Sequence, residues 1–141
     1  MSAKLSILLV EHDLQEIKTV LRALDPDSRR DRIRVVQNAR EALEIIQGNP
    51  SEYDSRPGLV LVDLDLPEDG CTRILKTLQA DRELRSIPAI VMTASMNDPA
   101  VLRAYEHGAH SCVCKPFELE AFHATARGIE KYWHSLYPVA D

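Results

Sequence analysis

Short runs of consecutive apolar residues, each followed by a polar side chain, recur along the chain. The clearest run covers residues 59–62, where four aliphatic residues precede Asp63. A run that is apolar at every position is typical of a strand buried on both faces, as in parallel sheets. Further apolar runs over 4–10, 33–36, 88–92 and 111–114 predict four more strands. Pro67 and Gly70 then predict a loop after the run at 59–62.

Between these runs the apolar residues recur at helical spacing. Over 14–24 they lie three or four positions apart, and Pro26 prevents the helix from continuing. Asn38 is a suitable N-cap for a helix over 39–47, because Glu41 follows it at capping-box spacing. Further helices are expected over 71–84, 99–108 and 118–133.

Strands that alternate with helices of this length predict successive βα units with right-handed connections. The expected fold class is therefore α/β, with a five-stranded parallel sheet that is doubly wound as (βα)5. Composition does not shift along the chain and no segment repeats, so we expect a single domain over residues 1–141.

Composition and charge argue against several classes of protein. The chain is 45% hydrophobic and 28% charged, which is ordinary for a globular domain. Its net charge of −5 provides no basic surface for a phosphate backbone, so we expect no nucleic-acid partner. No apolar run approaches a membrane span and no signal-peptide pattern is present, so we expect no membrane association. The three cysteines form no zinc-like array, and free thiols suit the cytoplasm, where we expect the protein to be located.

The residues that follow the predicted strands carry the candidate chemistry, because ligands of an open parallel sheet bind at the carboxyl ends of its strands. These residues are Glu11, His12 and Asp13 after the first strand, Asp63 and Asp65 at the third, Thr93 at the fourth and Lys115 at the fifth. Clustered carboxylates suit Mg²⁺, and a lysine with a hydroxyl suits an anionic phosphoryl group. Asp63 could itself accept a phosphoryl group as an acyl phosphate, or it could merely cap the following turn.

Four motifs in order resemble those of the receiver domain of two-component response regulators, a flavodoxin-like fold. They are residues 7–11, residues 61–67, residues 92–94 and residues 115–117. The resemblance implies that Asp63 is the phosphoryl acceptor, that Thr93 and Lys115 contact the phosphoryl group, and that a histidine kinase is the donor. It further implies that Glu11, Asp63 and the backbone carbonyl of Asp65 bind Mg²⁺. Such proteins are signalling proteins rather than enzymes.

The sequence departs from the family pattern at two positions. His12 stands where receivers carry a second acidic residue that binds the metal, and imidazole is a poor ligand for Mg²⁺. Asp13 could replace it if the loop turned that side chain inward. Cys112 stands where the family usually carries a switch aromatic residue.

The C-terminal segment 118–137 is predicted to be a helix with a wide apolar band. The residues assigned to this band are Phe122, Ile129, Tyr132, Trp133 and Leu136. The segment resembles that of stand-alone regulators that partner bacterial phytochromes and related histidine kinases, in which it forms a homodimer. The alternative is that these aromatic residues cover the core. We expect no output domain, so signalling would proceed by protein contact or by phosphorelay.

Two other functions stay open at this point. A pseudo-receiver would keep the fold as a binding module without being phosphorylated. The Asp63-Leu64-Asp65 motif also resembles the first motif of haloacid-dehalogenase-type phosphatases, although it follows the third strand rather than the first.

Overall fold

The computed structural model describes residues 6–24, 33–48 and 56–115, and the structural statements below concern these residues. The strands are β1 (Ile7–Val10), β2 (Ile33–Val36), β3 (Leu59–Asp63), β4 (Ala89–Thr93) and β5 (Ser111–Cys114). The helices are α1 (Leu14–Leu24), α2 (Ala39–Ile46), α3 (Gly70–Ala80) and α4 (Pro99–Glu106), with a short 3₁₀ segment, η2 (Pro67–Asp69). The expected helix and dimer contacts of 118–137 lie outside the described residues.

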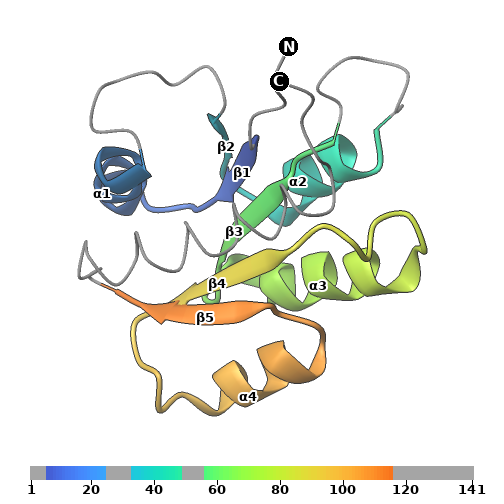
Figure 1. The fold of residues 1–141 in the computed structure, drawn as a ribbon. Coiled ribbons are helices and arrows are strands. Elements are labelled where there is room, and N and C mark those ends of the chain that lie inside the picture. Colours follow the sequence, from blue (N-terminus) through green and yellow to red (C-terminus); the bar gives the residue numbers. More distant parts are fainter. Residues whose placement is uncertain (1–5, 25–32, 49–55, 116–141) are drawn as a thin grey trace, which may run out of the picture.

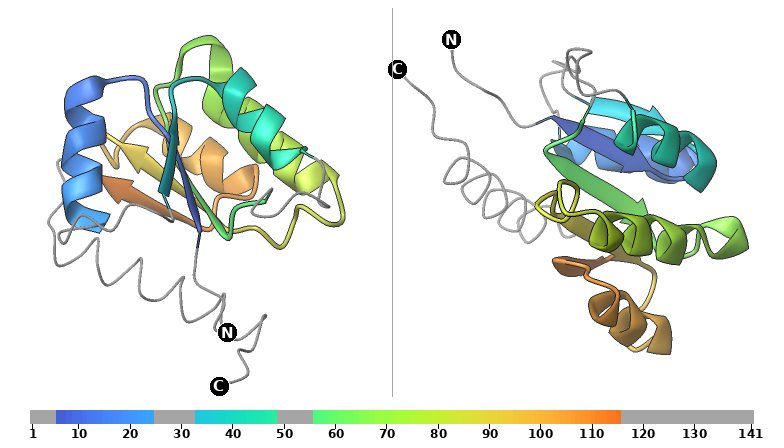
Figure 2. Two further views of the ribbon diagram at one scale, coloured as in Figure 1. Left: turned by 90° about the horizontal axis from the view of Figure 1, so that it is seen from above. Right: turned by 90° about the vertical axis from the view of Figure 1, so that its right-hand side faces the viewer.

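The five strands form one sheet in the order β2-β1-β3-β4-β5, and every neighbouring pair is parallel. This order is that of the doubly wound flavodoxin-like fold, and it confirms the predicted fold class. Figure 1 shows the sheet with α1 on one side and α2, α3 and α4 on the other. The view from above in Figure 2 shows the same arrangement.

Alternate residues of the central strands pack into two separate hydrophobic clusters, because side chains of a strand point to opposite faces of the sheet. Leu9, Leu61 and Met92 pack with Ile17 and Val20 of α1. The intervening residues of the same strands pack against α2, α3 and α4. Every residue of β3 and β4 is buried, which explains why these strands are apolar at each position rather than alternating.

Side-chain caps determine where two of the helices begin. Asn38 Oδ1 accepts a hydrogen bond from Glu41 N at 2.9 Å, which confirms the predicted cap of α2. Asp98 Oδ1 accepts one from Ala100 N at 2.8 Å, and Pro99 occupies the first position of α4. Gly108 follows α4 with a φ of +101°, a conformation that favours glycine.

The predicted end of α3 at residue 84 is wrong, because the helix ends at Ala80. Asp81 adopts an extended backbone, with φ −109° and ψ 125°. Its carboxylate accepts a hydrogen bond from Glu83 N at 2.8 Å, and its carbonyl accepts one from Arg85 N at 3.0 Å. Asp81 thus starts a separate turn, which is a typical role for aspartate.

The loop after β3 contains two residues in the left-handed region and a closely packed glycine. Glu68 and Asp69 in η2 have φ values of 59° and 55°, in the left-handed region. Gly70 follows, and a Cβ atom there would lie 2.9 Å from Leu66 Cβ and 3.3 Å from Ala39 Cβ. This position therefore requires glycine for close packing between the loop and α2. No helix in the described part of the chain has the length and apolarity needed to cross a membrane.

Candidate functional site

Glu11, Asp63 and Lys115 meet at the carboxyl end of the sheet. Each lies two residues beyond a residue of the cluster that packs on α1, namely Leu9, Leu61 and Val113. Because strand side chains alternate, this spacing directs all three to the side of the sheet that α1 covers. The sequence predicted that these residues would share an edge, and the structure confirms that they are in contact.

The ammonium group of Lys115 contacts three carboxylates at this site. Its Nζ donates hydrogen bonds to Glu11 Oε2 at 3.0 Å, Asp63 Oδ1 at 2.9 Å and Glu16 Oε2 at 2.8 Å. The side chains of Glu11 and Asp63 are 0% and 1% exposed, so a single cation is paired with two buried carboxylates. Such carboxylates are costly to bury unless they are paired.

Burial shifts the pKa values at this site. It raises the pKa of Glu11 to about 7, a shift that the hydrogen bond from Lys115 opposes and that neighbouring Asp63 increases. Burial alone would lower the pKa of Lys115, but its hydrogen bonds to Glu16, Asp63 and Glu11 outweigh that effect and raise it. Lys115 is therefore charged throughout the physiological range.

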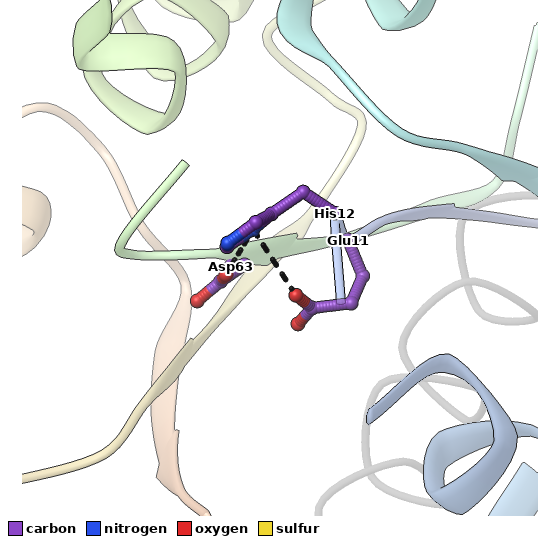
Figure 3. Close-up of side chains that lie close together, drawn as sticks. All are labelled: Glu11, His12 and Asp63. Atoms are coloured by element: carbon purple, nitrogen blue, oxygen red, sulfur yellow. Dashed lines mark ion pairs between the residues drawn. The ribbon is translucent and has the colours of Figure 1, made fainter. Parts of the chain in front are cut away.

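His12 lies on the opposite side of the two carboxylates from Lys115. Its Nδ1 is 3.4 Å from Glu11 Oε1 and 3.2 Å from Asp63 Oδ2, as Figure 3 shows. The contact with Asp63 lacks hydrogen-bond geometry, so Asp63 Oδ2 is buried without a hydrogen-bond donor among the described residues. Ligand atoms of Glu11, His12 and Asp63 all lie within 4.8 Å of one another, as in a possible metal site.

This donor set fits a divalent cation but only partly fits Mg²⁺. Two carboxylate oxygens are suitable magnesium ligands, whereas the third donor is an imidazole nitrogen. Asp13 does not supply the missing oxygen, because its Oδ1 accepts hydrogen bonds from Gln15 N at 2.8 Å and Glu16 N at 3.1 Å. The carboxylate of Asp13 instead caps the first turn of α1.

Asp65 and Thr93, also predicted as site residues, lie at the edge of the cluster. Asp65 N donates a hydrogen bond to Asp63 Oδ1 at 3.1 Å, while its own side chain is exposed. The role of its carbonyl as a metal ligand stays a prediction. Thr93 is buried, and its Oγ1 donates to Ser95 O at 3.0 Å. Thr93 lies two residues after Val91, which faces α3 and α4, so the two side chains point to the same face of the sheet. The hydroxyl of Thr93 therefore engages the loop after β4 rather than Lys115.

Sequence reasoning missed Glu16. It lies in the first turn of α1, three residues after the cap at Asp13, and it is 39% exposed. An acid three residues after the cap is already explained by its favourable position at a helix N-terminus. Its contact with Lys115 depends on how α1 packs on the sheet, which local spacing alone does not reveal.

Comparison with known proteins identifies this arrangement. A family model of the response regulator receiver domain matches residues 7–127. The chain belongs to this family. Receiver domains are signalling modules of two-component systems, and they bind a divalent cation at an acidic cluster like the one found here.

Three relatives show the extent of the similarity of this receiver domain. FilR2 of Methanothrix harundinacea, a probable methanogenesis regulatory protein, is 31% identical over 127 residues, or 90% of this chain and 82% of FilR2. Response regulator Rcp1 of Synechocystis sp. is 28% identical over 129 residues, or 90% of this chain and 87% of Rcp1. The structure of a Mn²⁺-bound form of Rcp1 has a TM-score of 0.70 and 28% identity, covering 92% of this chain and 94% of that one.

The third relative is the phosphorylated cyanobacterial phytochrome response regulator RcpA. Its crystal structure matches with a TM-score of 0.73 and 26% identity, covering 99% of this chain and 100% of that one. These matches confirm the predicted family and its likeness to phytochrome response regulators.

Cys112, the second position expected to depart from the family pattern, lies within β5. Cys112 is buried, and its backbone N donates a hydrogen bond to the hydroxyl oxygen of Tyr105 at 3.1 Å. The aromatic ring next to β5 thus comes from α4 instead of from β5 itself. Burial raises the pKa of the Cys112 thiol, and it raises that of Cys71 to about 12. All three cysteines are free, as predicted.

Proposed function

We propose that this protein is a response regulator whose Asp63 accepts a phosphoryl group from a histidine kinase. The contact between Lys115 Nζ and Asp63 Oδ1, at 2.9 Å in a buried site, is the observation that carries this proposal. A lysine adjacent to the acceptor oxygen can neutralise charge on the incoming phosphoryl oxygens. Phosphoryl transfer requires mainly such positioning and charge neutralisation from the protein.

The transfer forms a bond between Asp63 Oδ1 and phosphorus and breaks the phosphorus–nitrogen bond of the kinase phosphohistidine. The nitrogen of the departing imidazole takes a proton, and an acyl phosphate results. Asp65 N, which donates to the same oxygen at 3.1 Å, orients the carboxylate. A divalent cation held by Glu11 and Asp63 would supply further neutralisation of phosphoryl charge. Mg²⁺ is the ion expected from the family resemblance.

We place the protein with the stand-alone regulators of phytochrome-type histidine kinases in the cytoplasm. The similarity to RcpA over nearly the whole chain supports this placement. From the wide apolar band of segment 118–137 and the family resemblance, we further propose a homodimer that uses this segment, with output through protein contact or phosphorelay rather than nucleic-acid binding. The net charge of −5 is consistent with an output that does not involve nucleic-acid binding.

The test is phosphoryl labelling followed by intact mass measurement, with acetyl phosphate and with a phosphorylated phytochrome-type kinase as donors. We expect wild-type protein to gain the mass of one phosphoryl group, and Asp63→Asn to gain none. Asp69→Asn is the matched control, because Asp69 is an exposed aspartate of the same loop whose side chain makes no capping hydrogen bond and which is not a residue of the site. Labelling of Asp63→Asn at the wild-type level would refute the assignment.

The same assay separates the alternatives. A pseudo-receiver would not be labelled by either donor, and the proximity of His12 to Asp63 Oδ2 is the observation in its favour. Rapid turnover with release of inorganic phosphate would indicate a phosphatase of haloacid-dehalogenase type. The family match gives that third possibility no support.

A further inference from the structure

In each of the two buried carboxylates one oxygen contacts Lys115 and the other faces His12, while Glu11 Oε1 also accepts a hydrogen bond from Asp13 N and Asp63 Oδ1 one from Asp65 N. Lys115 Nζ donates hydrogen bonds to Glu11 Oε2 and Asp63 Oδ1, whereas Glu11 Oε1 and Asp63 Oδ2 face His12 Nδ1. Figure 3 shows the imidazole placed directly over these two oxygens. Two oxygens and one nitrogen therefore converge on a point that the lysine does not reach.

One of these two oxygens, Asp63 Oδ2, has no hydrogen-bonding partner among the described residues. The Asp63 side chain is 1% exposed, and among the described residues no donor makes a hydrogen bond to this oxygen. A buried carboxylate oxygen without a donor is destabilising, so it requires a cation or another compensating ligand. Because the oxygen points at His12 and Glu11, a ligand there would contact all three side chains.

The distances from His12 Nδ1 to the two carboxylate oxygens suit a small metal ion. Ligands about 2.0–2.1 Å from a tetrahedrally coordinated ion lie roughly 3.3 Å apart, and cis ligands of an octahedral ion lie roughly 3.0 Å apart. The observed separations from His12 Nδ1 are 3.2 Å and 3.4 Å. His12 Nδ1 therefore lies at a ligand-to-ligand distance from both oxygens, and all three donor atoms lie within 4.8 Å of one another.

The nitrogen donor determines which ion is favoured. Mg²⁺ prefers oxygen ligands, whereas imidazole suits first-row transition ions such as Co²⁺ and Zn²⁺. We propose that Glu11, His12 and Asp63 form a cation site that selects a first-row transition ion of this kind over Mg²⁺. The proposal refines the site of the proposed function, since Asp63 is also the phosphoryl acceptor there, but ion binding itself requires no phosphorylation.

The test measures ion selectivity by titrating Co²⁺ into metal-free protein and then displacing it with Mg²⁺. The visible absorption of bound Co²⁺ reports nitrogen and oxygen ligands. All variants carry Cys114→Ser, because the exposed Cys114 thiol could bind cobalt. We expect the reference protein to bind Co²⁺ and to retain it against a large excess of Mg²⁺.

Three variants identify the ligand. His12→Asp should reduce the Co²⁺-over-Mg²⁺ selectivity by about tenfold or more, because it restores an all-oxygen donor set. His12→Asn should weaken Co²⁺ binding without restoring Mg²⁺ affinity. His107→Asn, which changes a histidine at the end of α4, should leave the selectivity unchanged.

Equal selectivity in the reference protein and His12→Asp would overturn the inference, and so would preferential Mg²⁺ binding or no Co²⁺ binding by the reference protein. These outcomes are independent of the labelling assay. Failure of Asp63 to be phosphorylated would refute the proposed function and leave the cobalt titration interpretable.

Discussion

Replacing Lys115 with methionine should destabilise the protein far more than removal of an ordinary lysine. The substitution keeps a long side chain but removes the cation that contacts Glu11, Asp63 and Glu16. Two of these carboxylates are almost completely buried, so water cannot replace the lost ammonium group there. The variant must either keep uncompensated charge in the core or protonate one of the acids.

The magnitude follows from the geometry. A pair of charges about 3 Å apart attracts with roughly 5 kcal/mol at an effective dielectric constant of about 20. Desolvation offsets most of this attraction, but removing one partner of a buried pair typically costs about 3–5 kcal/mol. Glu11, whose pKa is about 7, can take up a proton and limit the loss. We therefore expect a loss of about 3 kcal/mol at pH 8 and a smaller loss at pH 6.

Urea unfolding in the presence of EDTA measures this loss, because the chelator prevents a metal ion from replacing the lysine. Lys76→Met, on the exposed face of α3, is the matched control and should change the free energy of unfolding by no more than about 0.5 kcal/mol. Adding Glu11→Gln to Lys115→Met should recover part of the loss, since one buried charge is then absent. If Lys115→Met and Lys76→Met are equally stable at pH 8, the reasoning about the buried carboxylates is wrong.

Three further measurements test other parts of the structure. The raised pKa of Glu11 contributes stability that should be fully present below about pH 4.5 and lost as the pH rises through about 7. Urea unfolding in EDTA should therefore show that wild type loses stability relative to Glu11→Gln over this interval. Asp13→Ala should cost about 1 kcal/mol in the same assay, whereas Asp13→Asn should be nearly neutral if Asp13 acts as a cap rather than as a metal ligand. Light scattering should give a dimer mass for wild type and a lower mass for the Tyr132→Ala, Trp133→Ala double variant; a wild-type mass of 15.9 kDa at micromolar concentration would contradict the dimer.

Much of the fold was predictable because the central strands are buried on both faces. Such strands contain almost no polar residues, so β3 and β4 are evident in the sequence. The end of α3 was not predictable from apolar spacing, because Leu84 continues the helical pattern although Asp81 has already left the helix. Leu84 is buried by the turn instead, and burial rather than helicity accounts for its apolar character.

The sequence predicted which residues of the candidate site lie at the ends of strands, but it did not predict the direction of every side chain. Glu11 and Asp63 lie at equivalent positions at the ends of the neighbouring strands β1 and β3, and Lys115 lies just beyond β5, on the far side of β4. These three residues meet as predicted. Thr93 is the last residue of β4, and alternation along the strand turns its hydroxyl to the other face. Whether Asp13 would turn inward could not be decided from the sequence, since both capping and metal binding favour an aspartate after β1.

The three contacts of Lys115 have a consequence for how the site must respond to a ligand. An ammonium group carries three N–H donors, and Glu11, Asp63 and Glu16 occupy all of them. A phosphoryl oxygen that binds Nζ must therefore displace one existing acceptor. Phosphorylation at Asp63 Oδ1 would turn that acceptor into an ester oxygen and free one donor. Of the two remaining acceptors Glu16 is the less costly to release, because at 39% exposure its carboxylate can be rehydrated, unlike buried Glu11. A phosphoryl group that bound Nζ through two oxygens would thus separate the first turn of α1 from Lys115, so that a chemical event at the end of one strand would change the start of a helix.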